Sequence, residues 1–163
     1  MPTLTDIALD AMGSDKAPEP EIKGAIQACR HLPVRVHLVG PEDRLRAALR
    51  DATRGHDLPI VIVPAAEWIT MDDKAAIAIR KKPGSTMRVG LRLVKEGKVA
   101  GFLTAGNTGA AMALAKMVLG PLQKTWANLS IQMKMMPLPE YLMTGKPYMF
   151  IVGMMAATFM KAI

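Results

Sequence analysis

The sequence predicts an α/β fold, a three-layer sandwich in which helices cover both faces of a mainly parallel sheet. Three observations support this prediction. Short apolar runs alternate with helix-length segments up to about Leu122, an order typical of parallel strands joined by crossover helices. Gly and Pro separate the segments. Half of the 163 residues are apolar, which is enough for the core of one domain or of part of a larger one.

The first part of the chain contains three predicted strands, over residues 5–10, 34–40 and 59–63, and two predicted helices, over residues 18–31 and 41–54. The strands are short apolar runs, and the second contains several β-branched residues. Glu19 and Glu21 fall in the first turn of the first helix, where the helix dipole favours negative charge.

The next part contains three predicted helices, over residues 72–81, 85–96 and 107–119, and one predicted strand, over residues 99–104. The first of these helices should end before Pro83, because the residue that precedes a proline avoids helical geometry. Ser85 is expected to cap the second helix, which Gly97 would terminate. Asn107 is expected to cap the third.

The most informative segment of the chain runs from Gly101 to Met117. An apolar strand ends in the turn Ala-Gly-Asn-Thr-Gly at residues 105–109, and a helix begins at once. The first turn of a helix has unpaired N–H donors and a dipole that favours negative charge, so this turn could bind an anion. Gly106 and Gly109 lack the side chains that would block a phosphate. Taken alone, the pattern is also typical of plain strand-to-helix packing.

A second segment, Asp-Ala-Met-Gly-Ser-Asp-Lys-Ala-Pro at residues 10–18, has a similar form. An apolar strand brings Asp10 to its carboxyl end, and a turn at Gly13 follows. Ligands of open parallel sheets bind at that edge. Because carboxylates repel phosphate, Asp10 and Asp15 are expected to orient a Lys, a backbone turn or a water. A purely structural role of Asp10 in the turn is the alternative.

Together these two segments resemble the bacterial phosphate acyltransferases of phospholipid synthesis. Three segments between them, at residues 66–74, 80–87 and 93–97, are also similar to that family. The resemblance runs in order from about Asp6 to Gln123, and several motifs in the same order are more specific than any one of them. Family members are longer than this chain, so the resemblance covers their N-terminal half and the predicted sandwich is incomplete relative to the family.

The resemblance implies transfer of an acyl group from acyl carrier protein to inorganic phosphate, which gives acyl phosphate and free carrier protein. It implies no cofactor, a homodimer, and a cytoplasmic location that includes the surface of the inner membrane. Phosphate is already anionic near neutral pH, so the reaction needs positioning and oxyanion donors rather than a strong base. The chain also lacks the Gly-x-Ser-x-Gly motif of a serine nucleophile.

The resemblance and the residue chemistry together define a candidate site. The expected catalytic residues are Asn107, Asp10 and Lys82. The expected phosphate-binding residues come from both turns, and they are Gly106, Asn107, Thr108, Gly109, Gly13 and Asp15. The backbone N–H groups of residues 107–109 would supply the main donors, and the hydroxyls of Thr104 and Thr108 could add to them. The side chain of Asn107 has an alternative role as the cap of its own helix.

The acyl carrier protein is expected to dock on a basic surface formed by Arg80, Lys81, Arg88, Arg92 and Lys95. The last three recur at i, i+4 and i+7, so they share one helix face. Acyl carrier protein is strongly acidic, and a basic face would steer its approach. The alternative is an ordinary solvated face. Nucleic-acid binding fits less well, because aromatic residues make up only 4% of the chain and no metal-finger pattern is present.

The sequence predicts no metal site, because His31, His37 and His56 are scattered and no Cys/His ligand spacing occurs. His37 lies in a predicted strand and is expected to be a partnered or exposed structural residue. Cys29 is the one cysteine and shares a helix face with Ile22, so it is expected to be a small core residue.

The family pattern is not followed everywhere. Ser14 stands where the family has a second Gly, and Lys16 stands where it has His, so an imidazole role at that position is in doubt. The family's later Gly-Ala-Asn-Val-Asp turn has no counterpart in residues 150–157. The alternative function is therefore a catalytically inactive half-enzyme that acts as a phosphate-binding or protein-interaction module.

The composition changes near Gln123, which predicts an α/β domain over residues 1–122 and a divergent Met-rich segment over residues 123–163. All nine Arg lie at or before Arg92, and eight of the fourteen Met follow Gln123. This segment could face a membrane or an interface, or could result from a truncated, shifted or altered translation of a longer gene. Its apolar stretch at residues 148–160 is short for a membrane span, which favours a buried or interface segment.

Overall fold

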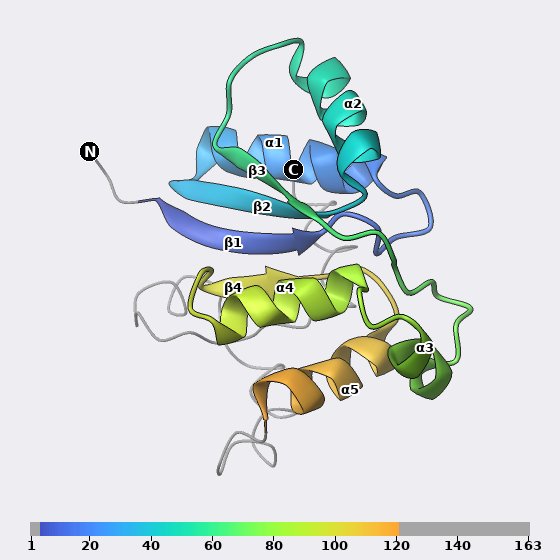
Figure 1. The fold of residues 1–163 in the computed structure, drawn as a ribbon. Coiled ribbons are helices and arrows are strands. Elements are labelled where there is room, and N and C mark those ends of the chain that lie inside the picture. The colour runs from blue at the N-terminus through green and yellow to red at the C-terminus, as the bar shows by residue number, and fades with distance from the viewer. Residues whose placement is uncertain (1–3, 121–163) are drawn as a thin grey trace, which may run out of the picture.

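The computed structural model describes residues 4–120, which form an α/β fold with one four-stranded sheet (Figure 1). Its elements, in chain order, are β1 (Thr5–Asp10), α1 (Glu19–His31), β2 (Val34–Gly40), α2 (Glu42–Thr53), β3 (Ile60–Pro64), α3 (Ala75–Lys81), α4 (Thr86–Lys95), β4 (Gly101–Leu103) and α5 (Thr108–Leu119). The strand order is β3-β2-β1-β4, and all the pairings are parallel. The predicted fold class is confirmed.

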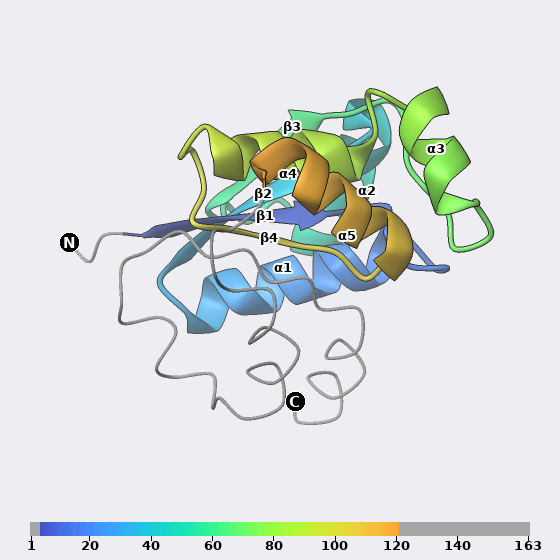
Figure 2. The ribbon, with the colours of Figure 1, turned by 90° about the horizontal axis from the view of Figure 1, so that it is seen from below.

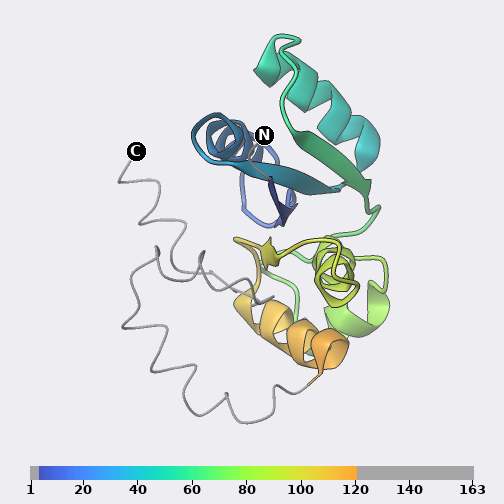
Figure 3. The same cartoon turned by 90° about the vertical axis from the view of Figure 1, so that its left-hand side faces the viewer.

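Helices cover both faces of the sheet, as Figure 2 shows for α1 and α4 on its opposite sides. On one face α1 and α2 pack against the sheet, with a core that includes Ile22, Leu38 and Leu45. On the other face α4 packs against the sheet, and α5 lies alongside α4 (Figure 3). Because side chains alternate along a strand, Leu38 and its neighbour Val39 belong to opposite cores.

The strands β1 and β2 have the predicted bounds. The other elements lie within one residue of the prediction at each end, except α3 and β4, which are each three residues shorter. The helix expected from residue 72 begins at Ala75, because residues 70–73 form a turn. In that turn the Thr70 N–H donates to Asp73 Oδ2 at 2.8 Å, and the Asp73 N–H donates to Thr70 O at 3.3 Å. The strand expected over residues 99–104 is β4, and among the described residues it pairs with Ile7–Leu9 of β1 alone.

The prediction that the Ser85 side chain caps α4 was wrong, because another residue supplies the acceptor. Ser85 occupies the capping position, yet its side chain makes no capping hydrogen bond. Glu67 serves instead: its backbone oxygen accepts from Thr86 N at 2.9 Å, and its Oε2 accepts from Gly84 N at 2.8 Å. The loop between β3 and α3 therefore caps a helix that lies further along the chain.

One single-residue prediction is confirmed, and a second is confirmed in part. His37 Nε2 lies 2.7 Å from Asp6 Oδ1, so this histidine is a partnered residue of the sheet. Cys29 packs against the α1 core while remaining half-buried, with its Sγ 3.6 Å from Pro59 O. Burial raises the pKa of the Cys29 thiol, which keeps it in the thiol form.

Within residues 4–120, no helix is both long enough and apolar enough to span a bilayer. The Met-rich segment over residues 123–163 and its apolar stretch lie outside the described residues. The domain boundary near residue 122 therefore stays a prediction.

Candidate functional site

The candidate site lies at the carboxyl edge of the sheet, where the loops after β1 and β4 meet. Because these strands are parallel neighbours, both loops leave the sheet on the same side (Figure 1). Asp10, at the end of β1, is buried, with an exposed fraction of 1%. Its Oδ2 accepts from the Thr104 hydroxyl at 2.9 Å, across 94 positions of sequence. The two segments singled out in the sequence are thus brought together.

The backbones of the two loops are in direct contact at Gly13 and Gly106. A Cβ on Gly13 would lie 3.0 Å from Gly106 N and 3.0 Å from Thr104 Oγ1. A Cβ on Gly106 would lie 3.1 Å from Gly13 O and 2.7 Å from Met87 Cε. Both glycines are buried. Their local role is therefore the close approach of one loop to the other.

In the β1–α1 loop, which carries Gly13 and Asp15, some backbone N–H groups already donate to side chains of the protein. Met12 N donates to Asp10 Oδ1 at 3.0 Å, and Ser14 N donates to Glu21 Oε1 at 3.1 Å. Glu21 is itself buried in α1. Two buried carboxylates therefore hold this loop, and an anion placed against its backbone would meet their negative charge. Asp15 is exposed.

The β4–α5 loop presents a different set of groups. Gly106 N donates to Thr104 Oγ1 at 3.1 Å, and Ala110 N donates to Asn107 Oδ1 at 3.0 Å. Between these two engaged N–H groups lie those of Thr108 and Gly109 in the first turn of α5, and both residues are exposed. A Cβ on Gly109 would make only ordinary contacts, 3.5 Å from Asn107 Oδ1 and 3.7 Å from Ala75 Cβ. The amides of Thr108 and Gly109 are the candidate donors at the start of α5.

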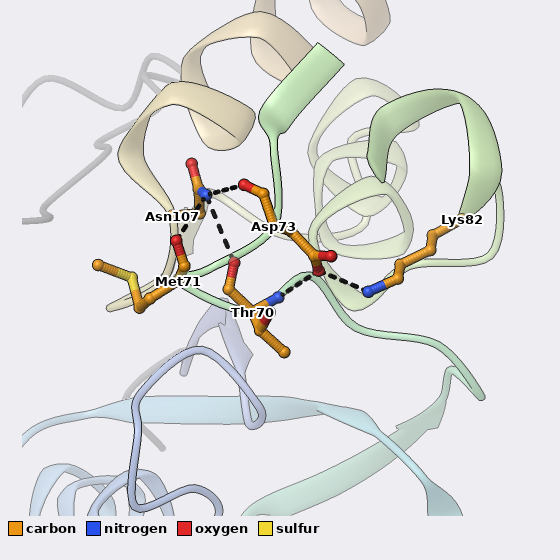
Figure 4. Close-up of polar contacts among 5 residues, drawn as sticks. All are labelled: Thr70, Met71, Asp73, Lys82 and Asn107. Atoms are coloured by element: carbon orange, nitrogen blue, oxygen red, sulfur yellow. Dashed lines mark hydrogen bonds and ion pairs between the residues drawn. The ribbon is translucent and has the colours of Figure 1, made fainter. Parts of the chain in front are cut away.

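The side chain of Asn107 caps α5, which confirms the predicted cap. Its Nδ2 also donates to Asp73 O at 2.9 Å, with longer contacts of 3.4 Å to Thr70 O and Met71 O (Figure 4). The amide group therefore fastens the 70–73 turn to the start of α5. Among the atoms of Asn107, this leaves the backbone N–H for the proposed anion.

Lys82, at the end of α3, pairs with the same turn. Its Nζ lies 2.5 Å from Asp73 Oδ2. Figure 4 marks this ion pair with a dashed line. The hydrogen bond from Lys82 holds the pKa of the Asp73 carboxyl below its usual range, and the Thr70 N–H acts in the same direction. The positive charge of Lys82 is thus balanced within the described structure, beside the loop that Asn107 anchors.

The pKa of the buried Asp10 carboxyl is raised above its usual range, although opposing influences act on it. Burial raises the pKa, and the nearby Glu21 carboxylate adds to this effect, whereas the Met12 N–H and the hydroxyls of Thr86 and Thr104 lower it. Within the described residues the buried Thr86 hydroxyl makes no hydrogen bond of ordinary geometry, so the link to Thr104 is the firmer one. Asp10 is therefore a buried acceptor rather than an exposed base.

The basic residues separate into two groups. Arg88, Arg92 and Lys95 line one open depression with Glu96, Met117 and Val118, at the junction of α4 and α5. Arg88 also donates to Ile79 O at 2.7 Å, which ties α4 to α3. Arg80 and Lys81 are exposed on α3 and line no part of this depression.

Sequence reasoning missed Glu67 and Glu21 as organisers of this edge. Glu67 accepts a hydrogen bond from the backbone N–H of Gly84, which is distant in sequence, and Glu21 accepts one from the backbone N–H of Ser14, across a turn. No local sequence pattern indicates either hydrogen bond. Among residues 4–120, no group of three His, Cys, Asp or Glu side chains could hold a metal ion.

Comparison with known proteins identifies the family. A protein-family model described as "Fatty acid synthesis protein" matches residues 5–133. The phosphate acyltransferase of Acidobacterium capsulatum is 74% identical over 119 residues, which are 73% of this chain and 35% of that protein. The phosphate acyltransferase of Koribacter versatilis is 66% identical over 116 residues, which are 71% of this chain and 32% of that protein. The chain belongs to the fatty acid synthesis protein family, which includes the phosphate acyltransferases.

The matched region contains every candidate site residue named above. It spans about a third of the length of these curated relatives, less than the half that the resemblance suggested. A relative from Heliobacterium modesticaldum, also named phosphate acyltransferase, is 45% identical over 114 residues and shows the same limited coverage, 34% of its length.

Proposed function

We propose that this chain takes part in the transfer of an acyl group from acyl carrier protein to inorganic phosphate, with the start of α5 as the phosphate site. The observation that carries the proposal is the pair of exposed residues Thr108 and Gly109, whose N–H groups belong to the first turn at the positive end of a twelve-residue helix. Their neighbours Gly106 and Ala110 have their N–H groups engaged within the loop. Family membership supports the same assignment.

The chemistry proposed at this site is direct displacement. A phosphate oxygen attacks the thioester carbonyl, and the carbonyl oxygen becomes an oxyanion. The tetrahedral species then expels the carrier-protein thiolate, which takes up a proton, and acyl phosphate is formed. Donors that hold the phosphate and oxyanion in place can supply most of the rate enhancement. Asp10 and Lys82 would contribute by organising the surrounding loops, through Thr104 and Asp73 respectively.

The carrier protein is proposed to dock at the depression lined by Arg88, Arg92 and Lys95. These cations share the surface with the apolar Met117, so the site combines positive charge with an apolar contact. Such a combination suits an acidic partner with an apolar recognition surface. Arg80 and Lys81 would extend the positive charge along α3. A homodimer, a cytoplasmic location and action at the membrane surface are further expectations of the resemblance.

A second function is favoured by a specific observation. The match covers about a third of the relatives' length, and residues 150–157 lack the acidic and Asn positions of the family's later turn. If catalysis needs that turn, the chain binds phosphate or a protein partner without turnover. The two functions share the α5 site and differ in whether the thioester is cleaved.

Single-turnover conversion of palmitoyl-acyl carrier protein, with and without phosphate, separates these functions. Release of free carrier protein that depends on phosphate supports the transferase. Binding of phosphate by calorimetry without release supports the inactive module. The absence of both, in a protein shown to be folded by circular dichroism, would refute the α5 site.

A matched pair of variants tests the site itself. Gly109→Val places a branched side chain beside the open amides, at a position where a Cβ has room, so the fold should persist. We expect phosphate affinity to fall about tenfold, which corresponds to about 1.4 kcal/mol. Gly24→Val makes the same substitution in open space on α1 and should leave phosphate affinity unchanged. Equal phosphate affinity in both variants would contradict the assignment.

A further inference from the structure

We infer that Asp10 is a positioning residue that sets the geometry of the phosphate loop through Thr104, rather than a group that touches phosphate. This inference deepens the proposed function and rests on it for the identity of the ligand. It begins from a continuous path of hydrogen bonds. Met12 N donates to Asp10 Oδ1, the Thr104 hydroxyl donates to Asp10 Oδ2, and Gly106 N donates to Thr104 Oγ1, at 3.0, 2.9 and 3.1 Å.

The path joins the two loops of the site and ends next to the proposed donors. Gly106 immediately precedes Asn107, whose N–H and those of Thr108 and Gly109 form the start of α5. Rotation of the peptide at Gly106 would change the direction of the N–H groups that follow it. The Thr104 hydroxyl, held by Asp10, fixes the orientation of that peptide. All three hydrogen bonds are shielded from water, because Asp10, Thr104 and Gly106 are buried.

The two hydrogen bonds that Asp10 accepts favour a side chain with two acceptor oxygens. Both of its partners are donors: the Met12 N–H has no other acceptor among residues 4–120, and the Thr104 hydroxyl donates to Asp10 while its oxygen accepts from Gly106. An ionised carboxylate has two acceptor oxygens, whereas an amide has one acceptor and one donor group. Asp10→Asn therefore keeps the shape and loses one of the two bonds.

Close packing transmits the position of one loop to the other. A Cβ on Gly106 would lie only 3.2 Å from the Cα of Gly13 and 2.7 Å from Met87 Cε of α4. The β4–α5 loop is thus confined between the β1–α1 loop and α4. Asp10, at the base of the first loop, sets the distance between them.

The test compares Thr104→Val, which removes the hydroxyl, with Thr104→Ser, which keeps it. Amide hydrogen exchange by NMR reports on Gly106, and calorimetry with inorganic phosphate reports on the site. We expect Thr104→Val to accelerate exchange of the Gly106 amide at least tenfold and to weaken phosphate binding about tenfold. Thr104→Ser should stay within twofold of the parent chain in both measurements. In an active protein, Thr104→Val should raise the KM for phosphate and leave the KM for the acyl carrier protein unchanged.

The outcomes separate this inference from the proposed function. If the parent chain binds no phosphate, the proposed function fails, while the exchange comparison still decides whether Thr104 holds Gly106. If Thr104→Val folds and leaves both exchange and phosphate affinity unchanged, the positioning role is overturned. If Thr104→Val does not fold, the parent chain gives the answer: equal exchange rates at Gly106 and Gly109 would overturn the role, because only Gly106 has the Thr104 bond.

Discussion

The contact between α4 and β4 gives the sharpest test of how the helix that borders the site is held. Gly90 lies in the middle of α4 and faces the ring of Phe102, which is buried. A Cβ on Gly90 would lie 2.2 Å from Phe102 Cε2 and 2.4 Å from Cδ2. Carbon atoms in contact are separated by about 3.5–4.0 Å, so helix and strand must move apart or the ring must turn.

The expected effect of Gly90→Ala combines two opposing terms. Alanine stabilises a helix interior by about 0.5–1 kcal/mol relative to glycine. Overpacking of a core typically costs about 1–3 kcal/mol. We therefore expect the free energy of unfolding to fall by about 1–2 kcal/mol. Gly24→Ala, in the interior of α1 with nothing within 4 Å of its Cβ, should raise the free energy of unfolding by about 0.5–1 kcal/mol.

Urea denaturation followed by circular dichroism measures both variants under the same conditions, and an unchanged slope shows that the denatured states are comparable. Subtracting the Gly24→Ala value from the Gly90→Ala value removes the propensity term and leaves the steric one. A Gly90→Ala protein as stable as Gly24→Ala would refute the reasoning, because it would show that Phe102 yields at no cost. Combining Gly90→Ala with Phe102→Leu should give a non-additive gain of more than about 0.5 kcal/mol, since the two sites are in contact.

Three further predictions concern the groups around α5 and α4. Asn107→Ala should lower the free energy of unfolding by about 1–2 kcal/mol, since a helix cap and the anchor of the 70–73 turn are both lost; an unchanged urea midpoint would contradict this. Lys82 lowers the pKa of Asp73, so this pair stabilises the fold above the ordinary pKa of 3.8 and ceases to do so as the pH falls through the lower folded pKa. Asp73→Asn should therefore show a smaller loss of stability on acidification below about pH 4 in thermal melts, and a parallel acid profile would count against the pair. Arg92→Glu should slow association with acyl carrier protein at low salt, whereas Lys23→Glu on the remote α1 should slow it less; equal rates by stopped flow would remove the docking face.

The sequence was sufficient wherever a local rule determines the structure. The bounds of β1 and β2 followed from short apolar runs, and the cap at Asn107 followed from a polar residue between a strand and a helix. The predicted position of both turns at one edge of the sheet also correctly placed Asp10 near the Gly106 loop. Parallel neighbours share a carboxyl end, so this proximity needs only the strand order.

The sequence failed where a bond joins distant segments. Ser85 has the correct residue type for a cap, yet Glu67 supplies the acceptors from another loop. Thr104 was expected to offer its hydroxyl to an anion, yet that hydroxyl donates to Asp10 across 94 positions. In each case a polar side chain had several chemically sensible partners, and tertiary packing selected one that no local spacing could indicate.

The two Gly-rich turns have similar sequences, but the structure shows that they differ in their hydrogen-bond acceptors. The β1–α1 turn is held by the carboxylates of Asp10 and Glu21, so negative charge already lies against its backbone. The β4–α5 turn is held by a hydroxyl and an amide, which are neutral, and its next N–H groups remain accessible. We therefore expect an anion to favour the second turn over the first, although Asp10 also accepts from Thr104 of the second turn. Gly13 would then serve the site by admitting the Gly106 loop, and phosphate would meet Thr108 and Gly109 first. Gly13→Ala should accordingly affect phosphate binding only as far as it displaces that loop, which amide exchange at Gly106 would reveal.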